Sequence, residues 1–145
     1  MKVKKILLVE DRQDDIDLTL RSLKENKITN KVDVVRDGAE ALDYIFAKGA
    51  YSGRNIEDLP SVILLDIKLP KIDGIEVLKR LRADERTKSL PVVILTSSRE
   101  ESDLINGYKF GCNSYVRKPI EFEEFSKAIK ELGLYWLLLN EPPVA

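Results

Sequence analysis

Short apolar runs alternate with helical segments along the chain, and this alternation restricts the possible folds more than any other feature. Each run is rich in Val, Ile and Leu, which is typical of a strand that is buried on both faces. The runs are residues 6–9, 32–35, 62–65 and 92–95, with a weaker fifth candidate at 114–116. Between them, apolar residues recur at helical spacing, as at Ile16, Leu20 and Leu23. This order predicts a doubly wound α/β fold with a mainly parallel sheet.

The length and the charge balance limit the classes of protein that this chain can belong to. Its 145 residues fit one domain, so we expect a single domain over 1–145 with a C-terminal extension at 134–145. Lys and Arg number 24 against 25 Asp and Glu, which does not favour a nucleic-acid partner. The basic residues at 2, 4 and 5 precede only four apolar residues, too few for a signal peptide. We therefore expect a cytoplasmic protein that binds neither nucleic acid nor membranes.

The sequence contains no histidine and only one cysteine. This composition excludes zinc sites built on His and Cys ligands, and also every Ser/His or Cys/His catalytic arrangement. Cys112 follows Gly111 and is interpreted as a small buried hydrophobic residue rather than as a nucleophile. Any reaction must therefore use carboxylates, Lys, Thr, Ser or Tyr.

Polar residues directly follow several of the predicted strands, at the edge where open parallel sheets bind ligands. They are Glu10, Asp11, Asp66, Thr96 and Lys118. A single acid at such a position is usually a solvated strand-end residue, but crowded carboxylates repel one another and require a compensating cation. Oxygen ligands of this kind suit Mg²⁺ or Mn²⁺. Asp66 is then a candidate nucleophile toward phosphorus, and Lys118 can neutralise charge on the phosphoryl oxygens.

Taken together, these motifs resemble the receiver domain of response regulators. They occur in the family's order, as Glu10-Asp11, residues 66–70 with Gly74, Thr96-Ser97, Tyr115 and Lys118-Pro119. The resemblance covers the chain to about Ile129 and implies a five-stranded parallel sheet in the flavodoxin-like order 2-1-3-4-5, with five helices. The longer loop at 49–60 and the tail at 134–143 are similar to the response regulators that are paired with phytochrome-type sensor kinases.

The resemblance also implies a role for each residue at the predicted acidic site. Asp66 would accept a phosphoryl group from a sensor histidine kinase in a reaction that depends on Mg²⁺. Asp11 and Asp66 would bind the metal directly, Glu10 would hold a metal-bound water, and the backbone carbonyl of Lys68 would complete the ligands. The side chain of Lys68 would lie near the path of the attacking water.

Three further residues would transmit the signal. The resemblance implies that Thr96 hydrogen-bonds the phosphoryl group, that Lys118 pairs with it, and that the Lys118-Pro119 peptide is cis. Tyr115 would turn inward as Thr96 moves, although a half-buried strand aromatic explains its position equally well from spacing alone. The chain would then be a switch that changes protein–protein contacts, rather than an enzyme with a substrate of its own.

Two other functions use a similar arrangement of strands and acids. Phosphatases of the haloacid dehalogenase type carry a second Asp two residues after the nucleophile as general acid, where this chain has Lys68. A flavodoxin-like binding module needs a loop rich in Gly, Ser or Thr after the first strand, where residues 10–15 are mostly acidic. Incubation with Mg²⁺ and acetyl phosphate separates the three functions, since it yields a stable adduct, steady turnover or no reaction.

The last predicted helix suggests a homodimer. One apolar stripe fits the domain core and consists of Phe122, Phe125, Ile129, Leu132, Trp136 and Leu139. After Gly133, residues 134, 135, 137 and 138 are also apolar, so this stretch is apolar on more than one face. Such a surface usually marks a protein contact, and two-fold pairing is its commonest form. The alternative is that Gly133 ends the helix and the remaining residues fold back over their own domain.

Overall fold

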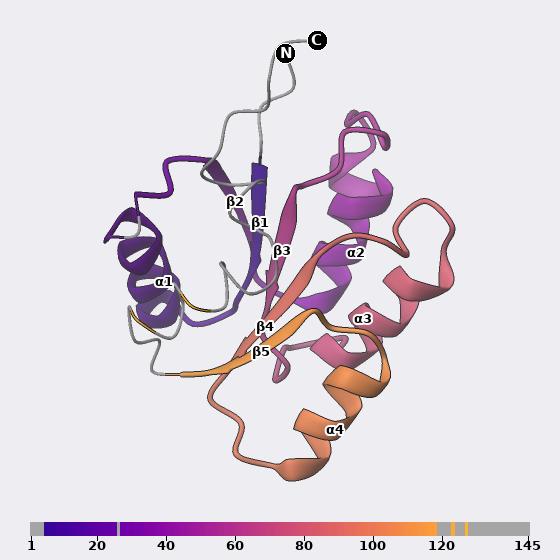
Figure 1. The fold of residues 1–145 in the computed structure, drawn as a ribbon. Helices are drawn as coiled ribbons and strands as arrows, with labels where there is room; N and C mark the ends of the chain where they lie inside the picture. The colour runs from indigo at the N-terminus through magenta and orange to yellow at the C-terminus, as the bar shows by residue number, and fades with distance from the viewer. Residues whose placement is uncertain (1–4, 26, 119–122, 124–126, 128–145) are drawn as a thin grey trace, which may run out of the picture.

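Five parallel strands form one sheet in the order β2-β1-β3-β4-β5 (Figure 1). This computed structural model describes residues 5–25, 27–118, 123 and 127. The strands are β1 (Lys5–Val9), β2 (Lys31–Val35), β3 (Val62–Leu65), β4 (Val92–Thr96) and β5 (Ser114–Arg117). The predicted fold class and strand order are therefore confirmed, and each apolar run seen in the sequence is a strand.

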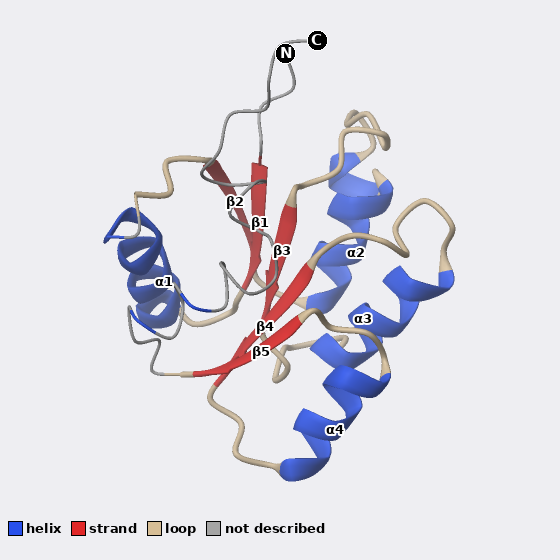
Figure 2. Ribbon diagram, viewed as in Figure 1, coloured by secondary structure: helices blue, strands red, loops and turns tan. Residues whose placement is uncertain are grey.

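Helices cover both faces of the sheet, with α1 on one face and α2, α3 and α4 on the other (Figure 2). The helices of the described residues are α1 (Gln13–Glu25), α2 (Gly38–Phe46), the short 3₁₀ helix η1 (Gly49–Tyr51), α3 (Gly74–Ala83) and α4 (Glu101–Lys109). Apart from residues 123 and 127, the expected fifth helix lies outside the described residues, as do the Pro119 peptide bond and the extension at 134–145. In the part of the chain that is described, no helix is long and apolar enough to cross a membrane.

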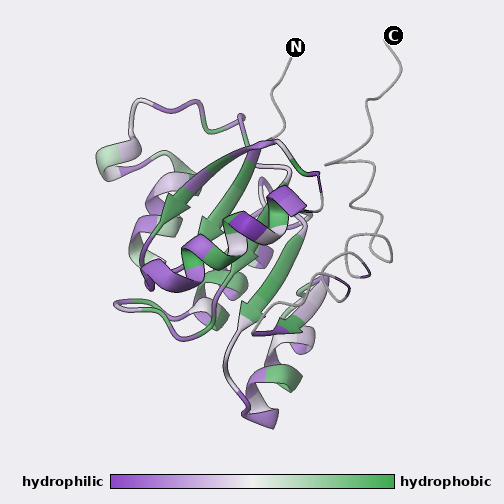
Figure 3. Cartoon of the chain, turned by 90° about the vertical axis from the view of Figure 1, so that its left-hand side faces the viewer, coloured by the Kyte–Doolittle hydropathy of each residue, from purple (hydrophilic) through white to green (hydrophobic). Residues whose placement is uncertain are grey.

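The core has two layers because alternate residues of each strand point to opposite faces of the sheet. In β1, Leu7 and Val9 pack with residues of α2 and α3, whereas Ile6 and Leu8 pack with residues of α1. The same alternation occurs in β3 and β4, so both faces of these strands are buried. Figure 3, which faces the α1 side, shows hydrophobic strands behind a helix that carries hydrophilic residues. Burial on both faces explains why β1, β3 and β4 appear in the sequence as continuous apolar runs.

The strand register places the functional ends of the strands beside one another. Val9 pairs with Leu65, so Glu10 and Asp66 leave neighbouring strands at the same level. The next helix, α3, begins directly behind Asp66. A Cβ atom at Gly74 would lie only 2.0 Å from the backbone oxygen of Asp66, so this close approach requires glycine. The fold therefore fixes both the position of Asp66 and the backbone that supports it.

Candidate functional site

Three carboxylates meet at the C-terminal ends of β1 and β3. Glu10, Asp11 and Asp66 each offer one oxygen atom, and these atoms lie within 4.8 Å of one another. Glu10 and Asp66 are buried, whereas Asp11 is partly exposed. The structure thus brings together the three acids that the sequence placed at this edge of the sheet.

Lys118 supplies the positive charge of this cluster. Its backbone N–H donates to the Thr96 carbonyl (2.8 Å), which fixes Lys118 beside the end of β4. Its side chain is buried, and its Nζ atom lies 3.4 Å from Asp66 Oδ2 and 3.1 Å from Asp15 Oδ2. Nζ also donates a hydrogen bond to Glu10 Oε1. The ammonium group is therefore surrounded by three carboxylates.

Burial and charge shift the proton equilibria of this cluster. Burial raises the pKa of Glu10 to about 7, while the hydrogen bond from Lys118 opposes this shift and the charge of Asp66 adds to it. Burial alone would lower the pKa of Lys118, but the hydrogen bond to Glu10 and the charge of Asp66 outweigh it, so that pKa is raised. One ammonium group is thus the positively charged partner of three carboxylates. Hard oxygen donors in a partly buried, acid-rich cluster fit Mg²⁺ or Mn²⁺.

The Asp66 carboxylate is oriented by its own loop and by Lys118. Oδ1 accepts a hydrogen bond from the Ile67 N–H (2.7 Å), and Oδ2 faces the ammonium group. The Asp66 N–H donates to the Val9 carbonyl (3.1 Å), which extends the β1–β3 pairing by one residue. This arrangement leaves Oδ2 as the oxygen that can attack an electrophile beside Lys118.

A chain of hydrogen bonds leads from the end of β4 to α4. Thr96 is fully buried, and its Oγ1 atom accepts a hydrogen bond from the Ser98 N–H (3.2 Å). Ser98 Oγ in turn donates to Asp103 Oδ2 (2.6 Å), in the first turn of α4. Thr96 is thus linked through Ser98 to the helix that follows it.

Tyr115 lies on β5 against α4. Its ring is half-buried, and a Cβ atom at Gly107 would lie 3.2 Å from Tyr115 Cδ2. Its hydroxyl oxygen is buried and has no hydrogen-bond partner among the described residues. Burial raises the pKa of this hydroxyl, and the charge of Asp103 adds to the effect. An unpaired buried hydroxyl is costly, so a movement that gave this hydroxyl a hydrogen-bond partner would be favourable.

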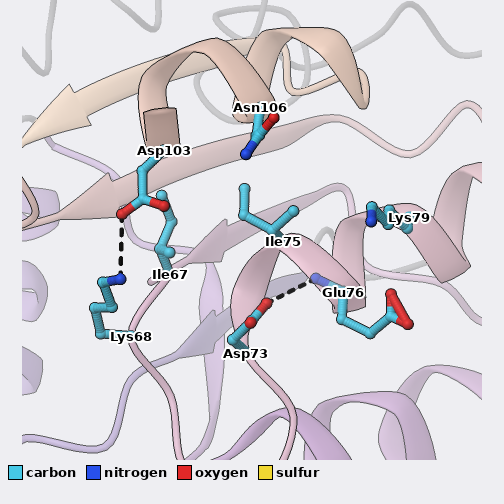
Figure 4. Close-up of a pocket in the computed structure, with 8 residues that line it drawn as sticks. All are labelled: Ile67, Lys68, Asp73, Ile75, Glu76, Lys79, Asp103 and Asn106. Carbon is cyan, nitrogen blue, oxygen red and sulfur yellow. Dashed lines mark hydrogen bonds and ion pairs between the residues drawn. The ribbon is translucent and has the colours of Figure 1, made fainter. Parts of the chain in front are cut away.

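Lys68 extends its side chain away from the carboxylate cluster and toward α4. Its Nζ atom lies 3.4 Å from Asp103 Oδ2 and 3.6 Å from Glu100 Oε2. Figure 4 shows Lys68 facing Asp103 at one end of a surface cavity between α3 and α4, with Asn106 and Ile75 projecting into it. The cavity is about 450 Å³ in volume, and acidic and basic side chains both line it. The Lys68 ammonium group therefore bridges the loop after Asp66 and the start of α4.

Sequence reasoning did not single out Asp15, although its carboxylate contacts Lys118. Asp15 occupies the third position of α1, four residues after Asp11 and at the same edge of the sheet. Its position in the first turn of the helix that follows Glu10-Asp11 was the available signal. The contact itself depends on how α1 docks onto the sheet.

A family profile and two curated relatives match the sequence of this chain. The profile described as response regulator receiver domain matches residues 6–130. The chain is 40% identical to the probable methanogenesis regulatory protein FilR2 of Methanothrix harundinacea, over 95% of this chain and 86% of the relative. It is 36% identical to response regulator Rcp1 of Synechocystis, over 98% of this chain and 95% of the relative.

Solved structures agree with these relationships. The bacteriophytochrome response regulator RtBRR superposes with a TM-score of 0.84 at 53% identity, over 97% of this chain and 84% of that chain. The Mn²⁺-bound form of Rcp1 superposes with a TM-score of 0.77 at 35% identity, over 97% of this chain and 99% of that chain.

Proposed function

The chain belongs to the response regulator receiver domain family and is a two-component phosphorelay regulator, and on that premise we propose that Asp66 is its phosphoryl acceptor. The observation that carries this assignment is the position of Asp66 Oδ2, 3.4 Å from a buried ammonium group and inside a group of three carboxylates. An exposed carboxylate would be solvated by water and would not need a buried ammonium group beside it. The donor is a sensor histidine kinase, and the similarity to a bacteriophytochrome response regulator favours a phytochrome-type kinase.

Asp66, the Ile67 N–H and Lys118 have different roles in the phosphoryl transfer. Asp66 Oδ2 attacks the phosphorus atom, an acyl phosphate O–P bond forms, and the bond from phosphorus to the donor breaks with its electron pair leaving on the donor. The Ile67 N–H holds Oδ1, so the carboxylate keeps its orientation during attack. Lys118 offers its ammonium group to the transferred oxygens, whose negative charge it partly neutralises.

The metal would be held by Asp11 and Asp66 directly and by Glu10 through a water, with the Lys68 backbone carbonyl completing the set. A bound Mg²⁺ or Mn²⁺ supplies positive charge that lets an anionic donor approach these acids. The Mn²⁺-bound form of Rcp1, at 35% identity, supports a divalent ion in this family. The acids themselves are close enough to share one ion.

The output is a change in protein contacts, for which Thr96 and Tyr115 are the switch residues. A phosphoryl group of about −1.5 to −2 charge attracts the Thr96 hydroxyl away from Ser98, and the link to α4 then loosens. Tyr115 packs under α4 and can respond to that movement. The partner that binds the changed surface is another protein, not nucleic acid or a membrane. The response regulator itself acts in the cytoplasm.

The decisive experiment is labelling of the protein by acetyl phosphate with and without Mg²⁺. We expect a stable adduct in the unchanged protein, and we expect Asp66→Asn or excess chelator to abolish it, because the acceptor is then lost or the charges are unscreened. Asp17→Asn, an exposed change on α1, is the matched control and should label normally. Undiminished labelling of Asp66→Asn would exclude this function. Continuous release of phosphate without an adduct would indicate the phosphatase instead.

A further inference from the structure

Lys118 is held by one carboxylate that takes no part in the acceptor or metal group. An ammonium group has three N–H donors, and Lys118 directs them at Glu10, Asp66 and Asp15. Glu10 and Asp66 belong to the group of acids that can share a metal ion, whereas Asp15 is outside it. The three partners of Lys118 are therefore not equivalent.

Two of these partners acquire other tasks when the site works. Asp66 becomes an acyl phosphate, which removes its negative charge as a carboxylate, and Glu10 is required near the metal. The Asp15 Oδ2 atom, 3.1 Å from Nζ, is the partner that keeps its charge and has no second task. A lysine side chain has four rotatable bonds, so an ammonium group without a fixed partner would sample many positions.

The first turn of α1 holds Asp15 in place for this contact. The next residue, Ile16, is buried against the sheet, and its N–H donates to the Arg12 carbonyl (2.9 Å). The Asp15 side chain is 19% exposed, so solvent screens it only in part. Arg12 is a weaker competitor for the carboxylate, since its Nε atom is 3.9 Å away and its side chain is 65% exposed.

We propose that Asp15 is a positioning residue that keeps the Lys118 ammonium group aimed at the phosphoryl group on Asp66 while Glu10 and Asp66 engage other partners. This proposal rests on the proposed function of Asp66. Asp15 acts through Lys118 and touches neither the metal nor the transferred group. The proposal predicts that loss of the Asp15 charge slows phosphorylation without changing the Mg²⁺ requirement.

The test compares Asp15→Asn with Asp15→Glu and with the matched control Asp14→Asn. Asp14 precedes Asp15 in the same helical turn, its side chain is 68% exposed, and its ion pair is with Arg12 at 3.6 Å. The control therefore removes the same charge from the same helix end and leaves Lys118 untouched. Phosphorylation by acetyl phosphate is measured over a range of Mg²⁺ concentrations, which separates the maximal rate from the half-saturating concentration of the ion.

We expect Asp15→Asn to lower the maximal rate about tenfold, the size expected for about 1.4 kcal/mol of lost stabilisation. The half-saturating Mg²⁺ concentration should stay unchanged, Asp15→Glu should recover most of the rate, and Asp14→Asn should behave as the unchanged protein. An equal rate in Asp15→Asn and Asp14→Asn would overturn the proposal. A defect that excess Mg²⁺ cures would also overturn it, because Asp15 would then act through the metal.

A second measurement follows Lys118 without any reaction. NMR relaxation of the Lys118 ε-methylene group reports how firmly the ammonium end is held. In Asp15→Asn, addition of Mg²⁺ should increase the mobility of this group, whereas in the unchanged protein it should stay restricted. Equal mobility in both proteins would refute the positioning role. If the unchanged protein accepts no phosphoryl group at all, the proposed function fails instead, and the mobility result still decides the role of Asp15.

Discussion

At the scale of single residues, burial determines chemistry as much as residue type does. Gly74 is required because any side chain there would collide with the Asp66 backbone. Asp66 is an acceptor candidate because Lys118 faces it inside the fold, whereas the exposed Asp14 pairs with Arg12 at the surface. For Cys112, burial suppresses reactivity instead of favouring it. The thiol is buried, as the sequence predicts.

The Cys112 thiol should resist alkylation in the folded protein. Burial raises its pKa to about 11, with Arg82 opposing the shift, whereas an unfolded thiol titrates near 8.5. At pH 8.5 iodoacetamide should therefore react much faster in urea than in buffer. Equal rates would contradict the burial of this thiol.

The same shift predicts how stability depends on pH. Between pH about 8.5 and about 11 the unfolded chain has lost the thiol proton and the folded chain has kept it, so the free energy of unfolding falls as pH rises. The stabilisation that the raised thiol pKa gives the folded state is fully present below pH about 8.5. It is lost as the pH rises through about 11. Urea unfolding of Cys112→Ala should show a smaller decline over this range than the unchanged protein.

At the scale of elements, the segment from β4 to α4 links the strand ends beside the three carboxylates to a helix at the surface. Thr96, Ser98 and Asp103 form a continuous chain of hydrogen bonds, and Lys68 joins that chain from the loop after β3. The first turn of α4 is therefore joined to the end of β4 through the Ser98 backbone N–H and the Ser98 and Asp103 side chains. Tyr115 contacts the middle of the same helix.

Thr96→Ala should separate phosphorylation from its structural consequence. Without the hydroxyl group, a phosphoryl group on Asp66 has nothing at this position to attract, so most of the phosphorylation-induced NMR shifts in α4 and β5 should disappear. Thr96→Ser keeps the hydroxyl group and is the matched control, which should retain them. Shifts of full size in Thr96→Ala would show that the signal leaves the site by another route.

At the scale of the whole molecule, apolar surface indicates where this domain meets other proteins. Ile105 and Tyr108 on α4 are 57% and 54% exposed, although both are large and apolar or aromatic. The apolar stretch after Gly133 lies outside the described residues, and its role in a homodimer remains our prediction from the sequence. Ile105 and Tyr108 thus form a candidate contact surface on α4.

Sedimentation at micromolar concentration should detect a homodimer, because one domain cannot cover all of the apolar residues between 134 and 139. Truncation after Gly133 should give a monomer. The double substitution of Ile105 and Tyr108 to Ser is the control and should leave the dimer intact, because we predict that residues 134–139 form the interface. A monomeric full-length chain, with and without a phosphoryl analogue, would rule the dimer out.

Local sequence patterns were sufficient to predict the sheet and most of the acidic site. Apolar runs are local features, and because parallel strands end at one edge, the residues that follow them had to converge, as Glu10, Asp66 and Lys118 do. The contact of Asp15 with Lys118 and the direction of Lys68 toward Asp103 are visible only in the folded chain. These contacts join side chains from a helix and from loops, so they depend on helix docking and on rotamers. Strand periodicity determines neither of these, because both are settled by packing between segments that are distant in sequence.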